Sequence, residues 1–514
     1  MRRMKTAAEL QEENAFLKAQ LNKKDGQLLQ KDEYIVQLEQ WLRHLRSKPF
    51  APSSEKLSPA QQTLFNEAED IEAEAGTAAV DDAAETITVA AHQRKTRPRV
   101  SLPDHLPREE VIHDLPEAEK ICPHDGSALK LIGSDDSEQL EYIPAQLKVL
   151  LHKRLKYACP CCEQHLVTAP KPKQPIEKSL AGPGLLAAIA TQKYCDALPL
   201  YRQSELFKRM GIALDRTNLA NWMVKCGDVA QPLINLLHEK LLEQPVIHMD
   251  ETPVQVLNEP GKTAQSQSYM WVQASSGEQP VRLFHYAPTR AQAVPLERLT
   301  EQTHAIMTDG YEGYGKACDD YGITRLGCWA HARRKFVDAQ KLQPKGKTGK
   351  ADQALTFIQK LYRIEAEIKN QPPDERHRIR QQQAKPVIDK LHDWLQKSLS
   401  HVPPNSVLGK ALTYLHNQWP RLIGYLDDGH YPIDNNLAEN AIRPFAIGRK
   451  NWLFSNSQTG ARASANLYSI IETAKANGLN PYHYLLKIFT DLPNAHTLED
   501  VEALLPWSVT LPAE

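Results

Sequence analysis

The sequence predicts a multidomain α/β protein, and three observations support this fold class. The chain has 514 residues, which at roughly 150 residues per domain accommodates three or four domains. Hydrophobic residues make up 41% of the chain and charged residues 24%, so there is enough apolar material for a folded core. Short alternating apolar segments typical of strands occupy the middle of the chain, and segments with helical periodicity lie on either side of them.

Charge and targeting signals exclude several classes of protein. Lys and Arg number 62 against 63 acids, so any surface for a polyanion must be local. No stretch approaches about 18 consecutive apolar residues, and the start MRRMKTAAELQEEN lacks the apolar segment of a secretory signal. The 8 cysteines are too few for a disulfide scaffold. We therefore expect a cytoplasmic protein with reduced thiols and no membrane partner.

Residues 1–48 carry a heptad repeat. One apolar row is interrupted by Lys24 and Lys31. The other row contains Asn14 followed by Leu21, Leu28, Ile35 and Leu42. Such a stripe is buried only when a second helix covers it, so the segment predicts a coiled-coil leucine zipper that makes the protein a homo-oligomer. The alternative is a helix that packs on its own chain.

Residues 49–100 predict an acidic flexible linker. Between residues 51 and 92 there are nine acids and one base, and this composition buries too little apolar surface to offset chain entropy. The linker ends in a basic knot of Arg94, Lys95, Arg97 and Arg99. A short basic run of this kind either contacts phosphates or is simply solvated.

Residues 101–172 predict a small zinc-finger-like module. Cys159 and Cys162 have the C-x2-C spacing that lets two thiolates reach one tetrahedral Zn²⁺, and Cys122 supplies a third candidate ligand. Asp125 stands where a fourth cysteine ligand would complete the pattern. Two interpretations remain open, one structural Zn²⁺ held by these four residues or a finger that has lost its metal.

Residues 176–238 predict a helical domain with a helix-turn-helix. After an apolar helix that opens at a Gly-Pro turn, two short helices flank a turn at Gly211. The second helix opens at Asp215 and is expected to bury Leu219 and Trp222. Its first residues, which we predict contact DNA in the major groove, are Arg216, Thr217 and Asn218. The alternative is an ordinary helix pair.

Residues 240–340 and 426–475 predict a ribonuclease-H-like mixed sheet. Three antiparallel strands (in PVIHMDETPVQV, SYMWVQAS and VRLFHYAP) are followed by a helix, a fourth strand (HAIMTDG), another helix and a fifth strand that runs into a helix (ITRLGCWAHARRKF). The first is expected to be a short core strand with alternating faces. Residues 341–425 have helical periodicity and predict an all-α insertion, and residues 476–514 predict a C-terminal helical element.

Three acids are candidates for one site. Asp250 lies in the first strand and Asp309 at the end of the fourth, and neighbouring strands are only about 4.8 Å apart. Glu439 follows Asp434, which is the expected N-cap of a later helix. Three hard oxygen donors suit Mg²⁺ or Mn²⁺, and two such ions about 4 Å apart support in-line phosphoryl transfer. The alternative for each acid alone is solvated surface.

Basic residues gather on both sides of the predicted insertion. Arg443, Arg449 and Lys450 follow Glu439. A second strip, opposed only by Asp338, comprises Arg333, Arg334, Lys335, Lys341, Lys345, Lys347 and Lys350. Both sets predict contacts with a DNA backbone, the alternative for the strip being a solvated loop.

Four segments in this order resemble the DDE transposases of the insertion-sequence-66 family, namely HMDETPVQV, MTDGYEGY, GCWAHARRKF and IDNNLAENAIRPFAIGRKNWLF. The resemblance covers nearly the whole chain and implies that Asp250, Asp309 and Glu439 form the catalytic triad. It also implies that Cys328 and His331 form a C-x2-H signature, in which His331 supports DNA or the scissile phosphate. A structural histidine is the alternative. The chain departs from the family at Asp125, where a cysteine is expected.

By that resemblance the protein is a transposase that binds terminal inverted repeats and carries out metal-dependent DNA cleavage and strand transfer. Its partners would be double-stranded DNA, as transposon ends and as target, further copies of the chain, and accessory proteins of the same element. It would act in the nucleoid of a bacterial cell. Two other interpretations remain, a catalytically silent DNA-binding regulator derived from a transposase and a nuclease that only hydrolyses.

Overall fold

The computed structural model describes residues 147–158, 166–171, 173–343 and 348–511, together with Lys18 and Lys24. The chain divides into two compact units, residues 1–82 with 172–511 and residues 83–171 with 512–514. Within the second unit, β1 (Lys156–Ala158) and β2 (Leu166–Thr168) form an antiparallel pair. The zipper (Lys18 and Lys24 apart), the linker with its basic knot, Lys345, Lys347 and the finger ligands Cys122, Asp125, Cys159 and Cys162 lie outside the described residues.

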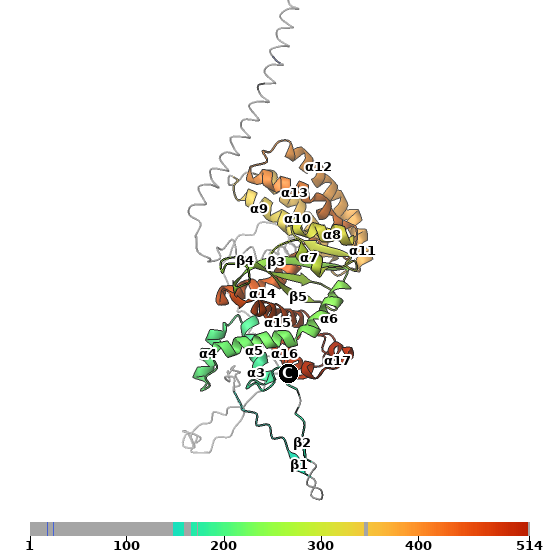
Figure 1. Ribbon diagram of the computed structural model, residues 1–514. Coiled ribbons are helices and arrows are strands. Elements are labelled where there is room, and N and C mark those ends of the chain that lie inside the picture. The colour runs from blue at the N-terminus through green and yellow to red at the C-terminus, as the bar shows by residue number, and fades with distance from the viewer. Residues whose placement is uncertain are drawn as a thin grey trace, which may run out of the picture. The chain divides into compact units, whose positions relative to one another are not determined.

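The larger unit is built on a mixed sheet (Figure 1). Its main strands are β3 (Val246–Asn258), β4 (Gln267–Ala274), β5 (Arg282–Ala287), β6 (Ala305–Thr308) and β7 (Thr324–Gly327). Their spatial order is β5-β4-β3-β6-β7. β4 is antiparallel to its two neighbours β3 and β5, and β6 and β7 run parallel to β3. The strands follow one another along the chain as the sequence predicts, and the first and fourth of them, β3 and β6, are neighbours. A further short strand, β8 (Ser455–Ser457), pairs with β3 and was not predicted.

The first strand is longer than predicted, because β3 runs for 13 residues and is not a short core strand. Its faces alternate as expected. Ile247 and Met249 are buried in the main core, whereas Val246 lies with Met307 and Leu326 in a separate apolar cluster. The extra length comes from pairing with β4, which continues as far as Gln255 and which the turn signals alone do not fix.

One edge of β3 has no strand beside it in the middle. β3 pairs with β6 over Val246–His248 and with β8 at Val256 and Asn258, so the residues between these points have a strand partner only on the β4 side. Pro253 lies in this stretch with its carbonyl turned toward the open edge, where Arg449 donates to it. A proline has no N–H to offer a ladder, so an unpaired edge accommodates it without loss. Asp250 belongs to the same stretch.

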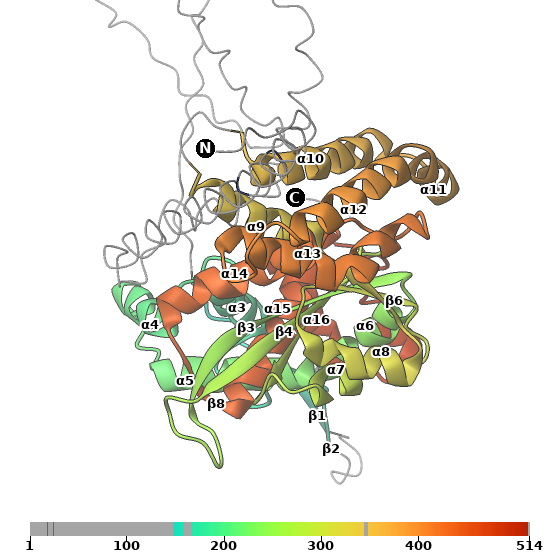
Figure 2. The same ribbon diagram turned by 90° about the horizontal axis from the view of Figure 1, so that it is seen from above.

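Helices cover the sheet on both sides (Figures 1 and 2). Helix α14 packs on β3 and β4, and α15 packs on β5 and on α5, while α16 packs on α3. These helices and their companions in the unit are α3 (Pro183–Tyr194), α4 (Leu200–Arg209), α5 (Arg216–Val229), α6 (Gln231–Leu242), α7 (Ala293–Arg298), α8 (Gly315–Tyr321), α9 (Trp329–Gln340), α14 (Asn436–Trp452), α15 (Gln458–Ala476), α16 (Pro481–Asp491) and α17 (Leu498–Glu502). Among the described residues, none of the helices combines the length and apolar character needed to cross a bilayer.

Between α9 and α14 the described chain is helical, as its periodicity predicts. The elements are α10 (Lys350–Ile368), α11 (Pro373–Ile379), a π-helical turn η4 (Arg380–Ala384), α12 (Lys385–Leu399) and α13 (Val407–Ile423). They share an apolar core with Trp329 and Phe336 of α9. Arg380 is fully buried, and its guanidinium pairs with Glu365 at 2.7 Å and donates to the Tyr425 carbonyl at 2.8 Å. Helix α13 also contacts β7, which joins this bundle to the sheet.

The two helices α4 and α5 flank a turn in which Gly211 has a φ of +87°, a conformation that suits glycine. Asp215 caps α5 by accepting a hydrogen bond from the Thr217 N–H at 2.9 Å. Leu219 is fully buried as predicted, whereas Trp222 is only half-buried at the edge of the core. The three residues that open α5, Arg216, Thr217 and Asn218, are exposed.

Replacing Gly227 by Ala should destabilise the larger unit. A Cβ at Gly227 of α5 would lie 2.6 Å from the Ala463 Cα of α15, so the two helices would have to separate. Overpacking of this kind costs about 1–3 kcal/mol of unfolding free energy, measurable by denaturant titration. Gly184→Ala in α3 is the matched control, because its added methyl would meet the Tyr482 hydroxyl at an ordinary 3.5 Å. Equal stability of the two variants would contradict this close helix contact.

Candidate active site

The parallel pairing of β3 with β6 brings two predicted site residues to the same place. His248 pairs with Met307. Asp250 and Asp309 each follow these partners by two residues, so both carboxylates lie just beyond the last paired residues of β3 and β6, Asp250 within β3 and Asp309 directly after β6. Glu439 lies in the first turn of α14, which packs on β3.

The three acids are close enough to influence one another. Burial raises the pKa of Asp250 well above its usual value, and the negative charges of Glu251, Glu439 and Asp309 raise it further. The only opposing contribution is the backbone N–H of Glu251, which donates to the Asp250 carboxylate at 2.9 Å. The single hydrogen bond to Asp250 therefore does not offset the effect of burial and of the neighbouring carboxylates on this residue.

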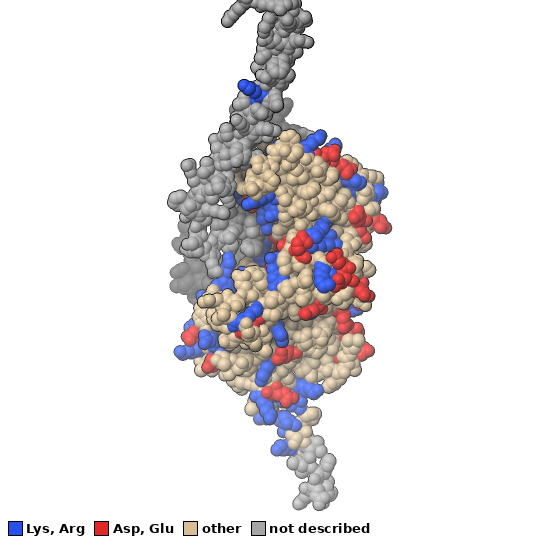
Figure 3. All heavy atoms as spheres, turned by 45° about the horizontal axis from the view of Figure 1, so that its top comes forward, with Lys and Arg blue, Asp and Glu red and all other residues tan. Residues whose placement is uncertain are grey.

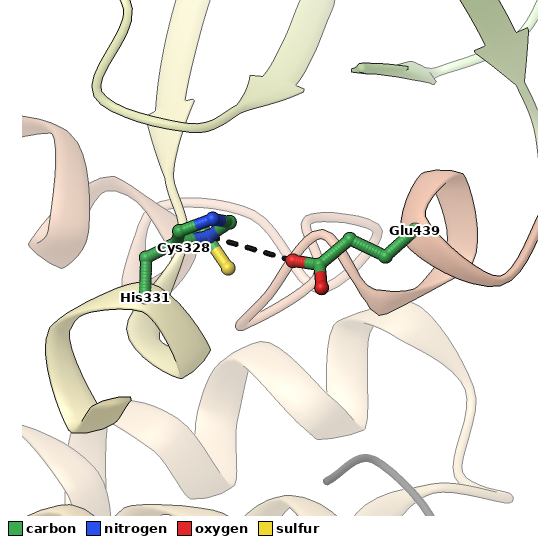
Figure 4. A group of neighbouring side chains, drawn as sticks. All are labelled: Cys328, His331 and Glu439. Atoms are coloured by element: carbon green, nitrogen blue, oxygen red, sulfur yellow. Dashed lines mark ion pairs between the residues drawn. The ribbon is translucent and has the colours of Figure 1, made fainter. Parts of the chain in front are cut away.

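The three carboxylates do not form the most compact group of candidate metal ligands. In the described part of the chain, the side chains whose ligand atoms all lie within 4.8 Å of one another are Cys328, His331 and Glu439. Figure 4 shows Glu439 extending from α14 toward the other two. Asp250, Asp309 and Glu439 therefore share a region of the molecule without sharing one tight cluster.

Glu439 is held by two residues of α9. One carboxylate oxygen accepts a hydrogen bond from the Arg334 guanidinium at 3.3 Å, and the other lies 3.4 Å from Nδ1 of His331. All three side chains are about a fifth to a quarter exposed, with Glu439 at 22%. Burial lowers the pKa of His331, which favours the neutral imidazole despite the nearby carboxylate.

Asn435 fastens the start of α14 to β3. Its side chain is fully buried, donates to the Met249 carbonyl at 2.8 Å and lies 3.1 Å from Nδ1 of His248. Asn435, and not Asp434, is the N-cap of α14, so the predicted cap is off by one residue. Asp434 instead accepts from the Asn436 N–H at 3.1 Å and from the Tyr362 hydroxyl at 2.8 Å, because the Asn435 amide is engaged by the strand.

A buried acid beside the site was not singled out from the sequence. The Glu251 side chain is 1% exposed, forms an ion pair with Arg290 and accepts from the Tyr314 hydroxyl at 2.5 Å. Arg290 also lies 3.9 Å from the Asp309 carboxylate and 3.9 Å above the Tyr311 ring. The available signal was the acid directly after Asp250 and the two tyrosines of GYEGY, but only the fold brings them together.

The predicted basic residues are distributed unevenly. In the strip on α9, Arg333 and Arg334 are half-buried. Lys335 is exposed over the Tyr414 ring at 4.6 Å, and Lys341 pairs with Asp338 at 3.1 Å.

On α14, Arg443 is half-buried and Lys450 exposed. Arg449 donates to the Thr252 hydroxyl at 3.2 Å and to the Pro253 carbonyl. Of these basic residues Arg334 contacts one of the three acids, Glu439, whereas Arg449 and Lys341 bind other groups of the protein.

Family models match most of the chain. The family model described as "Transposase IS66 family" matches residues 178–463, which is more than half of the chain and includes all three acids. This chain belongs to the IS66 transposase family. The IS66 C-terminal element matches residues 469–507, the zinc-finger binding domain of transposase IS66 matches residues 119–163, and "Transposase C of IS166 homeodomain" matches residues 37–111.

Relatives of this IS66 family member occur in Sinorhizobium fredii (strain NBRC 101917 / NGR234). Uncharacterized protein y4qI is 32% identical over 430 residues, covering 81% of this chain and 78% of the relative. Uncharacterized protein y4jD is 33% identical over 422 residues, covering 79% and 81%. Uncharacterized protein y4hP is 29% identical over 492 residues, covering 92% and 88%. The zinc-finger match spans the four predicted finger ligands.

Replacing Asp250 by Asn should stabilise this family member at neutral pH in the presence of a chelator. The folded state raises the pKa of Asp250, so the wild type loses stability as pH rises above the usual aspartate value of 3.8, and the uncharged amide does not. Thermal unfolding should give a higher Tm for the variant at pH 7, with the difference shrinking toward pH 3. A variant that is less stable than the wild type at pH 7 would contradict the claim that burial and the nearby carboxylates destabilise the charged form of Asp250.

Proposed function

We propose that the protein is a DNA transposase that cleaves transposon ends and joins them to target DNA, with Asp250, Asp309 and Glu439 as its catalytic acids. The observation that carries the proposal is the burial of Asp250 close to the other two acids, since burial first and then the charges of Glu251, Glu439 and Asp309 raise its pKa. The strand order β5-β4-β3-β6-β7 supports a ribonuclease-H-like catalytic domain, with Asp250 on β3 and Asp309 directly after the neighbouring strand β6. Membership of the IS66 transposase family supports the reaction class.

The donor set fits Mg²⁺ or Mn²⁺. Carboxylate oxygens are the ligands that these hard cations prefer, and a divalent charge would offset the repulsion that raises the pKa of Asp250. Asp250, Asp309 and Glu439 would hold the ions, with Glu439 turning away from His331. Two such ions supply an activated attacking oxygen and a stabilised leaving oxygen. The finger ligands Cys122, Asp125, Cys159 and Cys162 would hold one structural Zn²⁺.

The residues around the acids would position them and the DNA. Asn435 fixes the start of α14, and Arg334 restrains Glu439. Arg290 lies between Glu251 and Asp309 and limits the movement of Asp309. His331 would contact the scissile phosphate or the DNA beside it. Hydrolysis breaks one phosphorus–oxygen bond and frees a 3′ hydroxyl, whose oxygen then attacks a target phosphorus and displaces the target's own 3′ oxygen.

Double-stranded DNA is the proposed partner, both as terminal inverted repeats and as target. The exposed start of α5, with Arg216, Thr217 and Asn218, would enter the major groove. The basic residues of α9 and α14, Arg333, Arg334, Lys335, Arg443, Arg449 and Lys450, would contact backbone phosphates. In Figure 3 several Lys and Arg side chains lie near the middle of the visible face, with acidic side chains next to some of them. The zipper would pair two copies of the chain, and accessory proteins of the element would join the complex.

Replacing Asp250 or Asp309 by Asn, or Glu439 by Gln, should lower cleavage of end-bearing DNA in Mn²⁺ by about 10²-fold or more, because each change removes charge from the reaction centre. DNA binding by the same variants, measured by gel shift, should persist. Asp319→Asn is the matched control, since Asp319 is exposed on α8 away from the sheet ends. Joined products made at wild-type rate by any of the three variants would refute the triad. Binding without nicking by the wild type would instead indicate a silent regulator, and cleavage without joining a hydrolytic nuclease.

Replacing Arg216 by Ala should weaken binding to the terminal repeats by about 1–3 kcal/mol, because a base-edge contact in the major groove would be lost. The contrast to measure is the Kd for repeat DNA against the Kd for unrelated DNA at one salt concentration. Lys225→Ala, on the exposed side of the same helix nearer its end, is the matched control. Equal loss of affinity for both DNAs would mean that Arg216 contacts only phosphates.

A further inference from the structure

The compact cluster of Cys328, His331 and Glu439 has a chemistry that the proposed carboxylate site does not use. A thiol, an imidazole and a carboxylate converge with their ligand atoms within 4.8 Å of one another (Figure 4). Sulfur and imidazole nitrogen are ligands for Zn²⁺ and not for Mg²⁺. This cluster therefore selects a different metal from the one that three carboxylates select.

Its geometry is close to that of three corners of a tetrahedral zinc site. Zinc bonds of about 2.0 to 2.3 Å hold neighbouring ligand atoms roughly 3.5 Å apart. Nδ1 of His331 and Oε1 of Glu439 are already 3.4 Å apart. The remaining pairs lie within 4.8 Å, so closing the cluster takes a side-chain adjustment on the order of 1 Å.

Two of these atoms are buried without a hydrogen bond. Nδ1 of His331 and Oε1 of Glu439 have no hydrogen-bond partner among the described residues, although buried polar atoms normally have one. The other oxygen of Glu439 is taken by Arg334. A cation between His331 and Glu439 would satisfy both atoms together.

The sulfur of Cys328 lies at the start of α9, where Cys328 is the N-cap and is 1% exposed. Burial and the negative charges of Glu439 and Asp434 raise the pKa of this thiol well above its usual value, so a bound Zn²⁺ would have to displace the thiol proton. The backbone N–H of Asn435 donates to the Cys328 sulfur at 3.2 Å. Such a hydrogen bond is the kind of outer support that orients a metal ligand.

We infer that Cys328, His331 and Glu439 form a Zn²⁺ site with one open coordination position, separate from the Mg²⁺ or Mn²⁺ set and sharing Glu439 with it. Zinc bound there would hold Glu439 against α9, in the orientation seen in Figure 4, and withdraw it from Asp250 and Asp309. Micromolar zinc would then inhibit the reaction. This last consequence rests on the proposed function, whereas the site itself does not.

Cobalt binding tests the site directly, without DNA. The full chain carrying Cys159→Ser and Cys162→Ser, which disables the finger in the other unit, is titrated with Co²⁺ after metal removal. A thiolate-to-cobalt charge-transfer band that saturates at about one ion per chain is expected. Adding Cys328→Ser should abolish the band, and His331→Gln should weaken cobalt affinity by about tenfold or more. Cys195 is a half-buried cysteine elsewhere in the unit, and Cys195→Ser should leave the charge-transfer band and the cobalt affinity unchanged.

The result that overturns the site is the absence of the band, or a band that survives Cys328→Ser. Thermal unfolding of each variant distinguishes loss of the site from loss of the fold, and His331→Gln decides the question if Cys328→Ser unfolds. Inhibition is measured as the ratio of cleavage in Mg²⁺ with and without Zn²⁺, within each variant. Cys328→Ser should reduce the inhibition by Zn²⁺ about tenfold relative to the protein that retains Cys328. Equal inhibition of these two proteins would refute the idea that Glu439 serves both the Zn²⁺ site and the catalytic site. Because the titration contains no DNA, it stands even if no cleavage is found.

Discussion

The placement of the candidate site depends on one buried side chain, that of Asn435. Its amide contacts the Met249 carbonyl and the imidazole of His248, which belong to the two residues directly before Asp250. Because Asn435 is also the N-cap of α14, this contact fixes where the helix starts and therefore where Glu439 lies in its first turn. Removing the amide would leave buried polar atoms without partners, which costs about 1–3 kcal/mol. The helix and the strand are thus tied at the point where the chemistry is proposed.

The unpaired middle of β3 leaves space for α14 to approach the edge of the sheet. A strand partner there would cover the edge that α14 now approaches, and the polar groups of the edge are satisfied by side chains instead. Asn435 donates a hydrogen bond to the Met249 carbonyl near one end of the unpaired stretch. Arg449 donates to the Thr252 hydroxyl and the Pro253 carbonyl farther along. One helix therefore replaces a missing strand while carrying an acid of its own, so the gap in the ladder and the site arise from the same geometry.

The crowding of acids has a cost that the fold accepts. Asp250 experiences burial and three nearby carboxylates, and each of these disfavours its charged form. Glu439 is relieved through Arg334, and Glu251 through Arg290 and Tyr314. Reactive sites commonly trade stability for function in this way. Glu439 therefore has two sets of neighbours. One is Asp250 on the sheet, and the other is His331 and Arg334 on α9.

Sequence patterns were sufficient for the elements and their order. Short apolar segments ended by turn residues located β3 to β7, with alternating faces in the first of them, and helical periodicity located helices on both sides. Asp250, Asp309 and Glu439 could be chosen because strand ends and a helix start constrain where their side chains lie. The length of β3, the pairing of β8 and the role of Asn435 as the cap could not be read in this way.

Those features were decided by the tertiary structure, because they depend on partners far away in the chain. β8 reaches β3 across roughly two hundred residues, and Asn435 bonds to a strand 186 positions earlier. The convergence of Cys328, His331 and Glu439 is of the same kind, since a thiol and an imidazole three residues apart acquire a carboxylate neighbour only when α14 docks on the sheet. Local composition determines what each segment can become, and the packing of segments determines which side chains meet.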